Sequence, residues 1–212
     1  MHRELAALVL LIASGAAAEI IDRIAVTINS NRVITESEIF RQIRLTAFLN
    51  GEKPDYGPEN KRRTADRLVE QALIRREIET SRYITTSADW KPLYEQLRKR
   101  YKDEAAYKKA LAEYDISDED VQQSIEWQAT LLEFVAVRFR PGIQVPEADL
   151  KDYYDTQVAP KAAAGGEKLS FEDAREKIEE ILTQQRVDSA LDRWLGQSRT
   201  QSRIRYRQDV LK

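Results

Sequence analysis

The fold of this chain is decided by the stretch IAVTINSNRVITESE, which occupies residues 24–38. Residues 24–28 alternate apolar and polar side chains and are rich in β-branched types, a pattern typical of a half-buried strand. Residues 29–31 tolerate the positive φ angles of a tight turn, and a second short strand follows at residues 32–34. The first part of the stretch therefore predicts a β-hairpin.

The last part of the stretch predicts the start of a helix. Thr35 is followed three positions later by Glu38, which is the spacing of a capping box, where each side chain bonds to the backbone N–H of the other residue. We expect the helix to run to about Leu49, because the next segment, residues 50–58, contains two Gly and two Pro and is typical of a loop.

Amphipathic helices are predicted for most of the remaining chain. Ser117 with Asp120, and Ser170 with Asp173, repeat the capping pattern at two later positions. The helix that begins near Ser117 carries apolar residues on more than one side, which predicts a central position in the bundle. Apolar residues at helical spacing predict helices at about residues 59–82, 88–101, 103–113, 117–139, 146–156 and 171–198.

A last strand is predicted from the alternating pattern RIRYR at residues 203–207. A lone hairpin is only marginally stable in water, so we expect this strand to pair with the N-terminal hairpin. The sequence thus predicts a mostly α fold, a helical bundle with a small N-terminal β-hairpin joined by the C-terminal strand. A chain of this length suits one domain that is tied together at its two ends.

Residues 1–18 have the composition of a secretory signal peptide. A short charged start precedes an apolar run at residues 5–13 and three alanines at residues 16–18, which match a small-residue cleavage site. The alternative is an uncleaved membrane anchor, but the apolar run is short for a span of about 20 residues. We expect cleavage after Ala18, periplasmic localisation of residues 19–212, and no stable membrane insertion of the mature chain.

Composition excludes much chemistry. The chain has no Cys and one His, and this His2 belongs to the predicted signal peptide. The mature chain therefore offers no thiolate or imidazole, and it has no nucleotide-binding motif. A formal net charge of −2 does not favour a nucleic-acid partner. Carboxylate pairs such as Asp118 and Asp120 fit a solvated helix surface, so we expect no catalytic residue, metal or cofactor.

Several segments resemble, in order, those of the SurA-like periplasmic chaperones. Residues 21–38 resemble the opening strand, turn and helix start of that family, and residues 67–74 resemble its second helix. Residues 116–121 resemble the start of a later helix at the same place in the order of the family's segments. Residues 145–154 are similar to the segment that leads into a parvulin-type prolyl isomerase domain in family members. Residues 171–207 resemble the helix and strand that close the chaperone module. The resemblance covers nearly all of the mature chain.

The chain departs from this family where the isomerase domain would be inserted. The 29 residues from 141 to 169 are too few, because segments shorter than about 40 residues rarely fold alone. We therefore expect no isomerase activity and no enzyme function. The predicted organisation of the SurA-like domain, residues 19–212, is an N-terminal part at 19–158, a linker at 159–169 in place of the parvulin insertion, and a closing helix and strand at 170–212.

The resemblance implies an ATP-independent chaperone that binds unfolded envelope or outer-membrane proteins. Such a protein needs shallow apolar and aromatic surface, and aromatic side chains supply a large contact area with few rotatable bonds. The candidate peptide-binding residues are Tyr94, Tyr101, Tyr153 and Tyr154. The competing interpretation is that these tyrosines only pack helix against helix.

Two other classes of function compete with the chaperone hypothesis. Without an isomerase domain, the bundle could serve as a protein-interaction or scaffold subunit of the cell envelope. The other class is an enzyme that uses a buried pair of carboxylates. The small-residue segment at 159–166 could also act as a hinge for a homodimer in which two chains exchange their last helix and strand.

Overall fold

The computed structural model describes residues 22–81, 89–160 and 169–212. Helices account for 74% of these residues and the strands form one small antiparallel sheet, which confirms the predicted fold class. The predicted signal peptide at 1–18, and most of the predicted linker at 159–169, lie outside the described residues. In chain order the elements are β1 (Ile24–Ile28), β2 (Arg32–Thr35), α1 (Glu36–Asn50), α2 (Pro58–Ser81), α3 (Lys91–Arg98), α4 (Glu104–Tyr114), α5 (Asp118–Arg138), η1 (Arg140–Gly142), α6 (Glu147–Tyr153), η2 (Tyr154–Val158), α8 (Phe171–Gln201), β3 (Ile204–Tyr206) and α9 (Gln208–Leu211).

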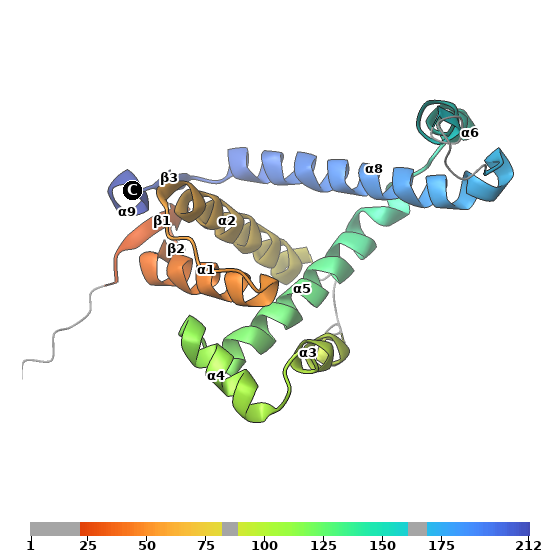
Figure 1. Ribbon diagram of the computed structural model, residues 1–212. Helices are drawn as coiled ribbons and strands as arrows, with labels where there is room; N and C mark the ends of the chain where they lie inside the picture. The colour runs from red at the N-terminus through yellow and green to blue at the C-terminus, as the bar shows by residue number, and fades with distance from the viewer. Residues whose placement is uncertain (1–21, 82–88, 161–168) are drawn as a thin grey trace, which may run out of the picture.

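The sheet brings the two ends of the described chain together (Figure 1). Its strand order is β2-β1-β3 with antiparallel pairs, so the C-terminal strand joins the N-terminal hairpin as predicted. Val26 of β1 pairs with Ile34 on one side and with Tyr206 on the other. Asn29 takes the positive φ of the hairpin turn, 52°, and its N–H donates to the carbonyl of Arg203 at 2.8 Å. The sheet closes within one chain, and exchange between two chains stays a prediction.

Two helix starts follow the local signals in the sequence. At α1, the hydroxyl of Thr35 accepts a hydrogen bond from the N–H of Glu38, whose carboxylate accepts one from the N–H of Thr35 at 2.9 Å. At α5, Ser117 and Asp120 form the same reciprocal pair. Gly51 follows the last residue of α1 with a φ of 71°, the left-handed conformation that glycine adopts without strain.

The first of four hydrophobic clusters among the described residues lies between the sheet, α1, α2 and α9. Its buried members are Ala25, Val26, Ile28, Ile34, Ile39, Ile43, Ala65, Val69, Leu73, Val210 and Leu211. The sequence does not predict α9, because four residues are too short to show a helical period. Burial of Val210 and Leu211 in this cluster holds α9 in place.

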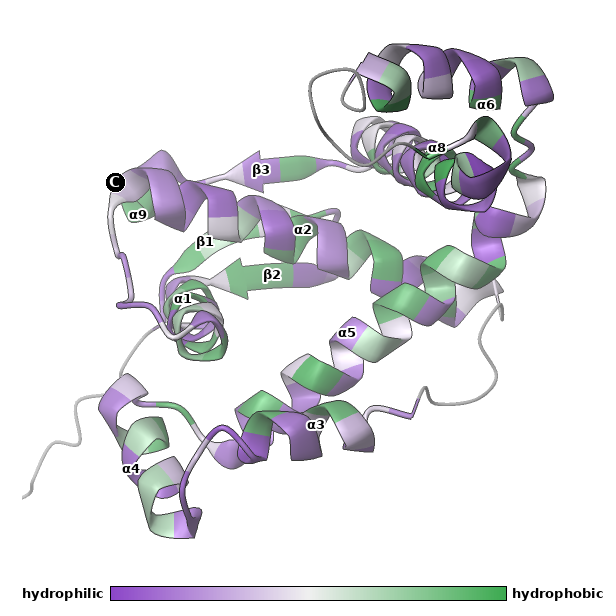
Figure 2. Ribbon diagram, turned by 45° about the vertical axis from the view of Figure 1, so that its right-hand side comes forward, coloured by the Kyte–Doolittle hydropathy of each residue, from purple (hydrophilic) through white to green (hydrophobic). Residues whose placement is uncertain are grey.

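Helix α5 joins the second and third clusters. Its N-terminal half packs with α3, α4 and the end of α1 around Phe48 and Tyr107. Further along, Phe134 contacts the edge of Trp194 from α8, with ring centroids 5.8 Å apart, and packs with Ile74 of α2. Figure 2 shows hydrophobic residues along much of α5. Helix α5 therefore contributes to two of the four clusters, but Leu132, which was part of its predicted apolar surface, is 68% exposed.

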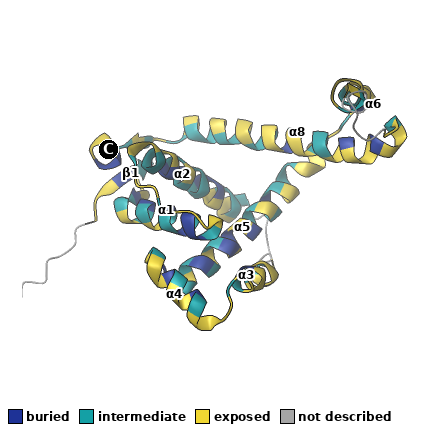
Figure 3. Ribbon diagram, in the orientation of Figure 1, coloured by how far each residue is buried: buried dark blue, intermediate teal, exposed yellow. Residues whose placement is uncertain are grey.

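The fourth cluster builds an arm that projects from the rest of the molecule (Figure 1). In the arm, α6 and η2 pack against the first turns of α8 around Leu150, Ala174 and Ile178. Between the arm and β3, α8 is largely exposed or half-buried along its length (Figure 3). Helix α8 ends at Gln201, three residues beyond the predicted end, because Ser202 is the first residue with extended backbone angles.

Helix α3 is shorter than the sequence predicts. It ends at Arg98, whereas the apolar spacing predicts a helix to residue 101. Tyr101 lies outside the helix and stacks on Phe48 of α1, with ring centroids 6.0 Å apart and an interplanar angle of 8°. The apolar side chain of Tyr101, which predicted a longer α3, therefore packs against α1 from the turn that follows α3.

Candidate functional site

A cleft lies where α1 and α2 face α3 and α5. It consists of two cavities of about 460 Å³ and 370 Å³. The cavities adjoin, because Gln42 of α1, Gln71 of α2 and Ser124 of α5 line both of them. Helix α3 borders only the first cavity, and β2 borders only the second, through Arg32.

One wall of the cleft is a polar row on α2. Arg67, Gln71 and Arg75 follow one another at intervals of four residues, so they lie along one side of the helix. Arg67 lines the first cavity, Arg75 lines the second, and Gln71 lines both. With a rise of about 1.5 Å per residue, the two arginines are about 12 Å apart along the helix axis. The row therefore follows both cavities.

The lining combines amides with apolar side chains. The amides are Gln42, Asn50, Gln71, Gln96, Gln123 and Gln128. The main apolar contributors are Leu45, Leu49, Leu93, Leu97, Ile125 and Trp127. A primary amide both donates and accepts, so it can bond to either polar group of an extended backbone. Within the described chain, the amides of Gln71, Gln96 and Gln128 have no hydrogen-bond partner and stay available for this role.

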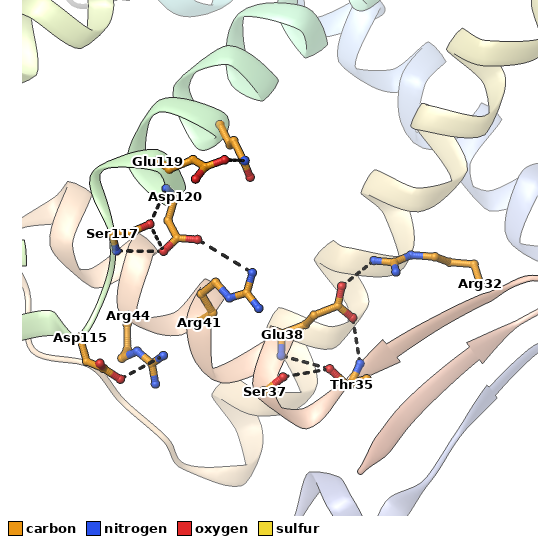
Figure 4. A network of polar contacts seen from close by, with 11 residues as sticks. Arg32, Thr35, Ser37, Glu38, Arg41, Arg44, Asp115, Ser117, Glu119 and Asp120 are labelled. Atoms are coloured by element: carbon orange, nitrogen blue, oxygen red, sulfur yellow. Dashed lines mark hydrogen bonds and ion pairs between the residues drawn. The ribbon is translucent and has the colours of Figure 1, made fainter. Parts of the chain in front are cut away.

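The two carboxylates that line the cleft are already paired with arginines (Figure 4). Glu38 of α1 accepts a hydrogen bond from Arg32 at 2.8 Å. Asp120 of α5 lies 3.9 Å from the guanidinium of Arg41 on α1. The same two carboxylates complete the capping boxes of α1 and α5. Their charge is therefore compensated by neighbours and by helix ends.

Three other arginines at the cleft, Arg67, Arg75 and Arg100, have no carboxylate within ion-pair distance in the part of the chain that the structure describes. The guanidinium of Arg75 lies 3.9 Å from the ring centroid of Trp127. Arg100 donates to the backbone carbonyl of Leu49 at 3.3 Å. The cleft is therefore net positive on a chain whose formal net charge is −2.

Tyr94 and Tyr101, two of the predicted peptide-binding residues, lie in the second hydrophobic cluster and do not line either cavity. The hydroxyl of Tyr94 donates to Asp118 at 2.6 Å and accepts from Arg98 at 3.0 Å. Tyr101 is half-buried against the ring of Phe48. Both side chains thus connect α3 or the turn after it to other helices.

Tyr153 and Tyr154, the other two predicted residues, lie in the arm. Both are half-buried in the fourth cluster. Tyr154 meets the edge of Phe171 with ring centroids 5.5 Å apart, and its hydroxyl donates to the carbonyl of Leu169 at 2.7 Å. The structure therefore does not bring the four tyrosines together in one site. Contact of each with a peptide stays a prediction.

The acidic pair Asp118 and Asp120 has structural partners. Burial by itself raises the pKa of Asp118, but hydrogen bonds from the hydroxyls of Tyr107 and Tyr94 hold it below its ordinary value. Asp120 caps α5, as described above. Among residues 22–81, 89–160 and 169–212, no group of three or more His, Cys, Asp or Glu side chains could hold a metal ion.

Comparison with known proteins gives no assignment. No family model, curated protein or solved structure matches the chain. Over the described ranges, no helix is both long and apolar enough to cross a membrane. The cleft is therefore the feature on which a function must be argued. Sequence reasoning missed it, although the spacing of Arg67, Gln71 and Arg75 was a usable signal of a polar face on α2.

Proposed function

We propose that this chain is a SurA-like, ATP-independent chaperone that holds unfolded envelope or outer-membrane proteins in the periplasm. The observation that carries the proposal is the cleft between α1, α2, α3 and α5, with its mixed lining of amides and apolar side chains. Binding is favoured when the apolar side chains of the cleft cover apolar client surface and remove it from water. The amides can form hydrogen bonds with the N–H and C=O groups of the client backbone. Neither contact depends strongly on client sequence.

Binding and release in this proposal are passive. The sequence has no nucleotide-binding motif, so occupancy of the cleft follows from mass action between free chaperone and unfolded client. The proposal includes no isomerase activity, because the 29 residues from 141 to 169 are too few to form a separate folded domain.

An aggregation assay tests the proposal. An outer-membrane β-barrel protein is diluted from urea with and without the purified chain, and light scattering is followed in the absence of nucleotide. We expect suppression of scattering at a few-fold excess of the chain, and no acceleration of prolyl isomerisation in a peptide assay run in parallel. No suppression at that excess would contradict the proposal.

A pair of matched substitutions tests whether the cleft is the binding site. Ser124 lines both cavities, so Ser124→Trp places an indole between the walls. Ser189→Trp makes the same change on the exposed surface of α8. With circular dichroism spectra unchanged in both, we expect Ser124→Trp to lose most of the suppression and Ser189→Trp to keep it. Equal loss of suppression in both variants would show that the binding site lies outside the cleft.

The proposed location is tested separately. Cell fractionation and N-terminal sequencing of the chain recovered from the periplasmic fraction should give a sequence that starts at Glu19. Recovery of the chain with Met1 in the cytosol would contradict both the predicted cleavage and the proposed client class.

A second candidate function is a scaffold or interaction subunit of the envelope. The arm favours it, because a projecting element with its own hydrophobic cluster is a natural attachment point. So do Leu132 and Val137 of α5, which are 68% and 44% exposed. Cross-linking in cells distinguishes the two functions: one stoichiometric folded partner supports the scaffold, and many unfolded partners support the chaperone.

A further inference from the structure

The charges around the cleft indicate which client segments it prefers, an inference that rests on the proposed function. We propose that the cleft selects extended segments with two carboxylate side chains at positions i and i+4. The carboxylates would bond to Arg67 and Arg75 at the two ends of the polar row on α2, with Gln71 between them.

The N–H groups at the edges of both guanidinium groups in this row are available to a ligand, although one face of Arg75 lies over the ring of Trp127 at 3.9 Å from its centroid. In the described residues neither Arg67 nor Arg75 has an ion pair, although Glu70 attracts Arg67, and Glu79 and Glu126 attract Arg75, from longer range. The planar guanidinium binds a carboxylate through two parallel hydrogen bonds, which is stronger than a bond between neutral groups. The lining acids of the cleft do not compete, because each has its own arginine.

The spacing of the row sets the spacing of the ligand. Arg67 and Arg75 are about 12 Å apart along α2. An extended chain rises about 3.3 Å per residue and places every second side chain on the same face, so residues i and i+4 lie about 13 Å apart on one face. Residues i and i+1 point to opposite faces and cannot serve both arginines. Gln71 lies opposite the residue at i+2 and can bond to the backbone there.

Four nine-residue peptides of serine and threonine, with one leucine at position 5, test the inference by fluorescence anisotropy with the full chain. They carry Glu at positions 3 and 7, Glu at positions 3 and 4, Gln at positions 3 and 7, or Lys at positions 3 and 7. We expect the first to bind about fivefold tighter than the second or third, and the Lys peptide to bind weakest. Added salt should reduce the advantage, because exposed charges are screened.

Matched variants assign the effect to the row. Arg67→Gln combined with Arg75→Gln should remove the preference for the first peptide. Arg76→Gln combined with Arg193→Gln changes the net charge equally at two exposed positions that do not line the cleft, and should leave the preference intact. Urea unfolding of both double variants checks that the fold is retained.

The outcomes separate this inference from the proposed function. Equal affinity for the Glu and Gln peptides overturns the carboxylate preference, while continued suppression of client aggregation leaves the proposed function intact. Equal affinity for the two Glu peptides overturns the spacing. Failure of every peptide to bind, together with failure to suppress aggregation, overturns both the inference and the proposed function.

Discussion

The side chain of Asp66 on α2 is the centre of a polar network that includes residues of β3 and α8. Its carboxylate accepts hydrogen bonds from the hydroxyl of Tyr206 on β3 at 2.5 Å and from the guanidinium of Arg199 on α8 at 3.0 Å. Arg62 of α2 stacks over the ring of Tyr206 at 3.8 Å from its centroid. This network connects the closing strand and the closing helix to α2, and burial with the bond to Asp66 raises the pKa of Tyr206 to about 12.

Replacing Tyr206 by Phe removes the two hydrogen bonds of the Tyr206 hydroxyl, which donates to Asp66 and accepts from Arg199 at 3.0 Å. Both bonds are lost while the ring stays, so we expect the free energy of unfolding to fall by about 2 kcal/mol in urea denaturation. Tyr56→Phe is the matched control, because the hydroxyl of Tyr56 has no partner among the described residues and should change stability by less than about 0.5 kcal/mol. Equal effects at both positions would show that the hydroxyl of Tyr206 contributes nothing to stability.

Glu70, which accepts a hydrogen bond from Arg199 at 3.0 Å, gives the network a pH dependence. Burial raises the pKa of Glu70 above its ordinary value of 4.5, despite the nearby Arg199. The folded chain therefore binds the proton of Glu70 more tightly than the unfolded chain does. Ionised Glu70 lowers the free energy of unfolding at neutral pH, and this loss disappears below pH 4.5. We expect Glu70→Gln to raise the free energy of unfolding at pH 7 and to leave it nearly unchanged at pH 4, measured by urea denaturation. A gain of the same size at both pH values would contradict this.

Asp66 acts in the opposite direction. Burial raises its pKa, but the bonds from Tyr206 and Arg199 outweigh burial and hold it below its ordinary value of 3.8. The stability that these bonds supply is therefore present above pH 3.8 and is lost as the pH falls through the lower pKa of the folded chain. Because Asp66 and Glu70 share Arg199, the two effects should be measured in the same buffer series.

Among the secondary-structure elements, those with a local signal were predictable from the sequence. Thr35 with Glu38, and Ser117 with Asp120, mark the starts of α1 and α5 without reference to the rest of the chain. The pairing of β3 with β1 was predictable because a hairpin alone leaves an edge that a third strand stabilises. Helix α9 had no such signal, since only burial in the core fixes it.

The cleft was not predictable, because it is formed by sides of four helices. Gln42, Gln71, Ser124 and Gln96 come from α1, α2, α5 and α3, and no sequence period relates them. The candidate tyrosines illustrate the same limit. The sequence left open whether Tyr94 contacts a peptide or packs against another helix, and its hydroxyl donates to Asp118, which lies 24 positions away.

Substitution by Ala should change the free energy of unfolding in opposite directions at two glycines, one directly after a helix and one inside a helix. Gly51, after α1, has a φ of 71°, so Gly51→Ala should lower the free energy of unfolding by about 1 kcal/mol. Gly196, inside α8, has open space where a Cβ would lie, so Gly196→Ala should raise it by up to about 1 kcal/mol. Chemical denaturation of both variants checks the pair, and a stabilising Gly51→Ala would contradict the assigned turn.

In the whole molecule, stability depends on the last residues of the described chain. Leu211 of α9 is 4% exposed in the first cluster, so Leu211→Ala should cost about 2–5 kcal/mol of unfolding free energy. Leu132 of α5 is 68% exposed, and Leu132→Ala should stay within about 0.5 kcal/mol of the parent chain. Thermal unfolding of the two variants checks this, and similar midpoints would mean that α9 is not part of the core.

The pairing of Val26 with Tyr206 joins residues 180 positions apart, and this distance governs when the molecule can fold. The central strand β1 has one neighbour, β2, that begins four positions after Ile28, and another, β3, that begins 176 positions after it. Contacts between such distant residues form late and slowly, since a long loop must close before they form. The first cluster therefore stays incomplete until β3 and α9 have been synthesised and have reached β1 and α2.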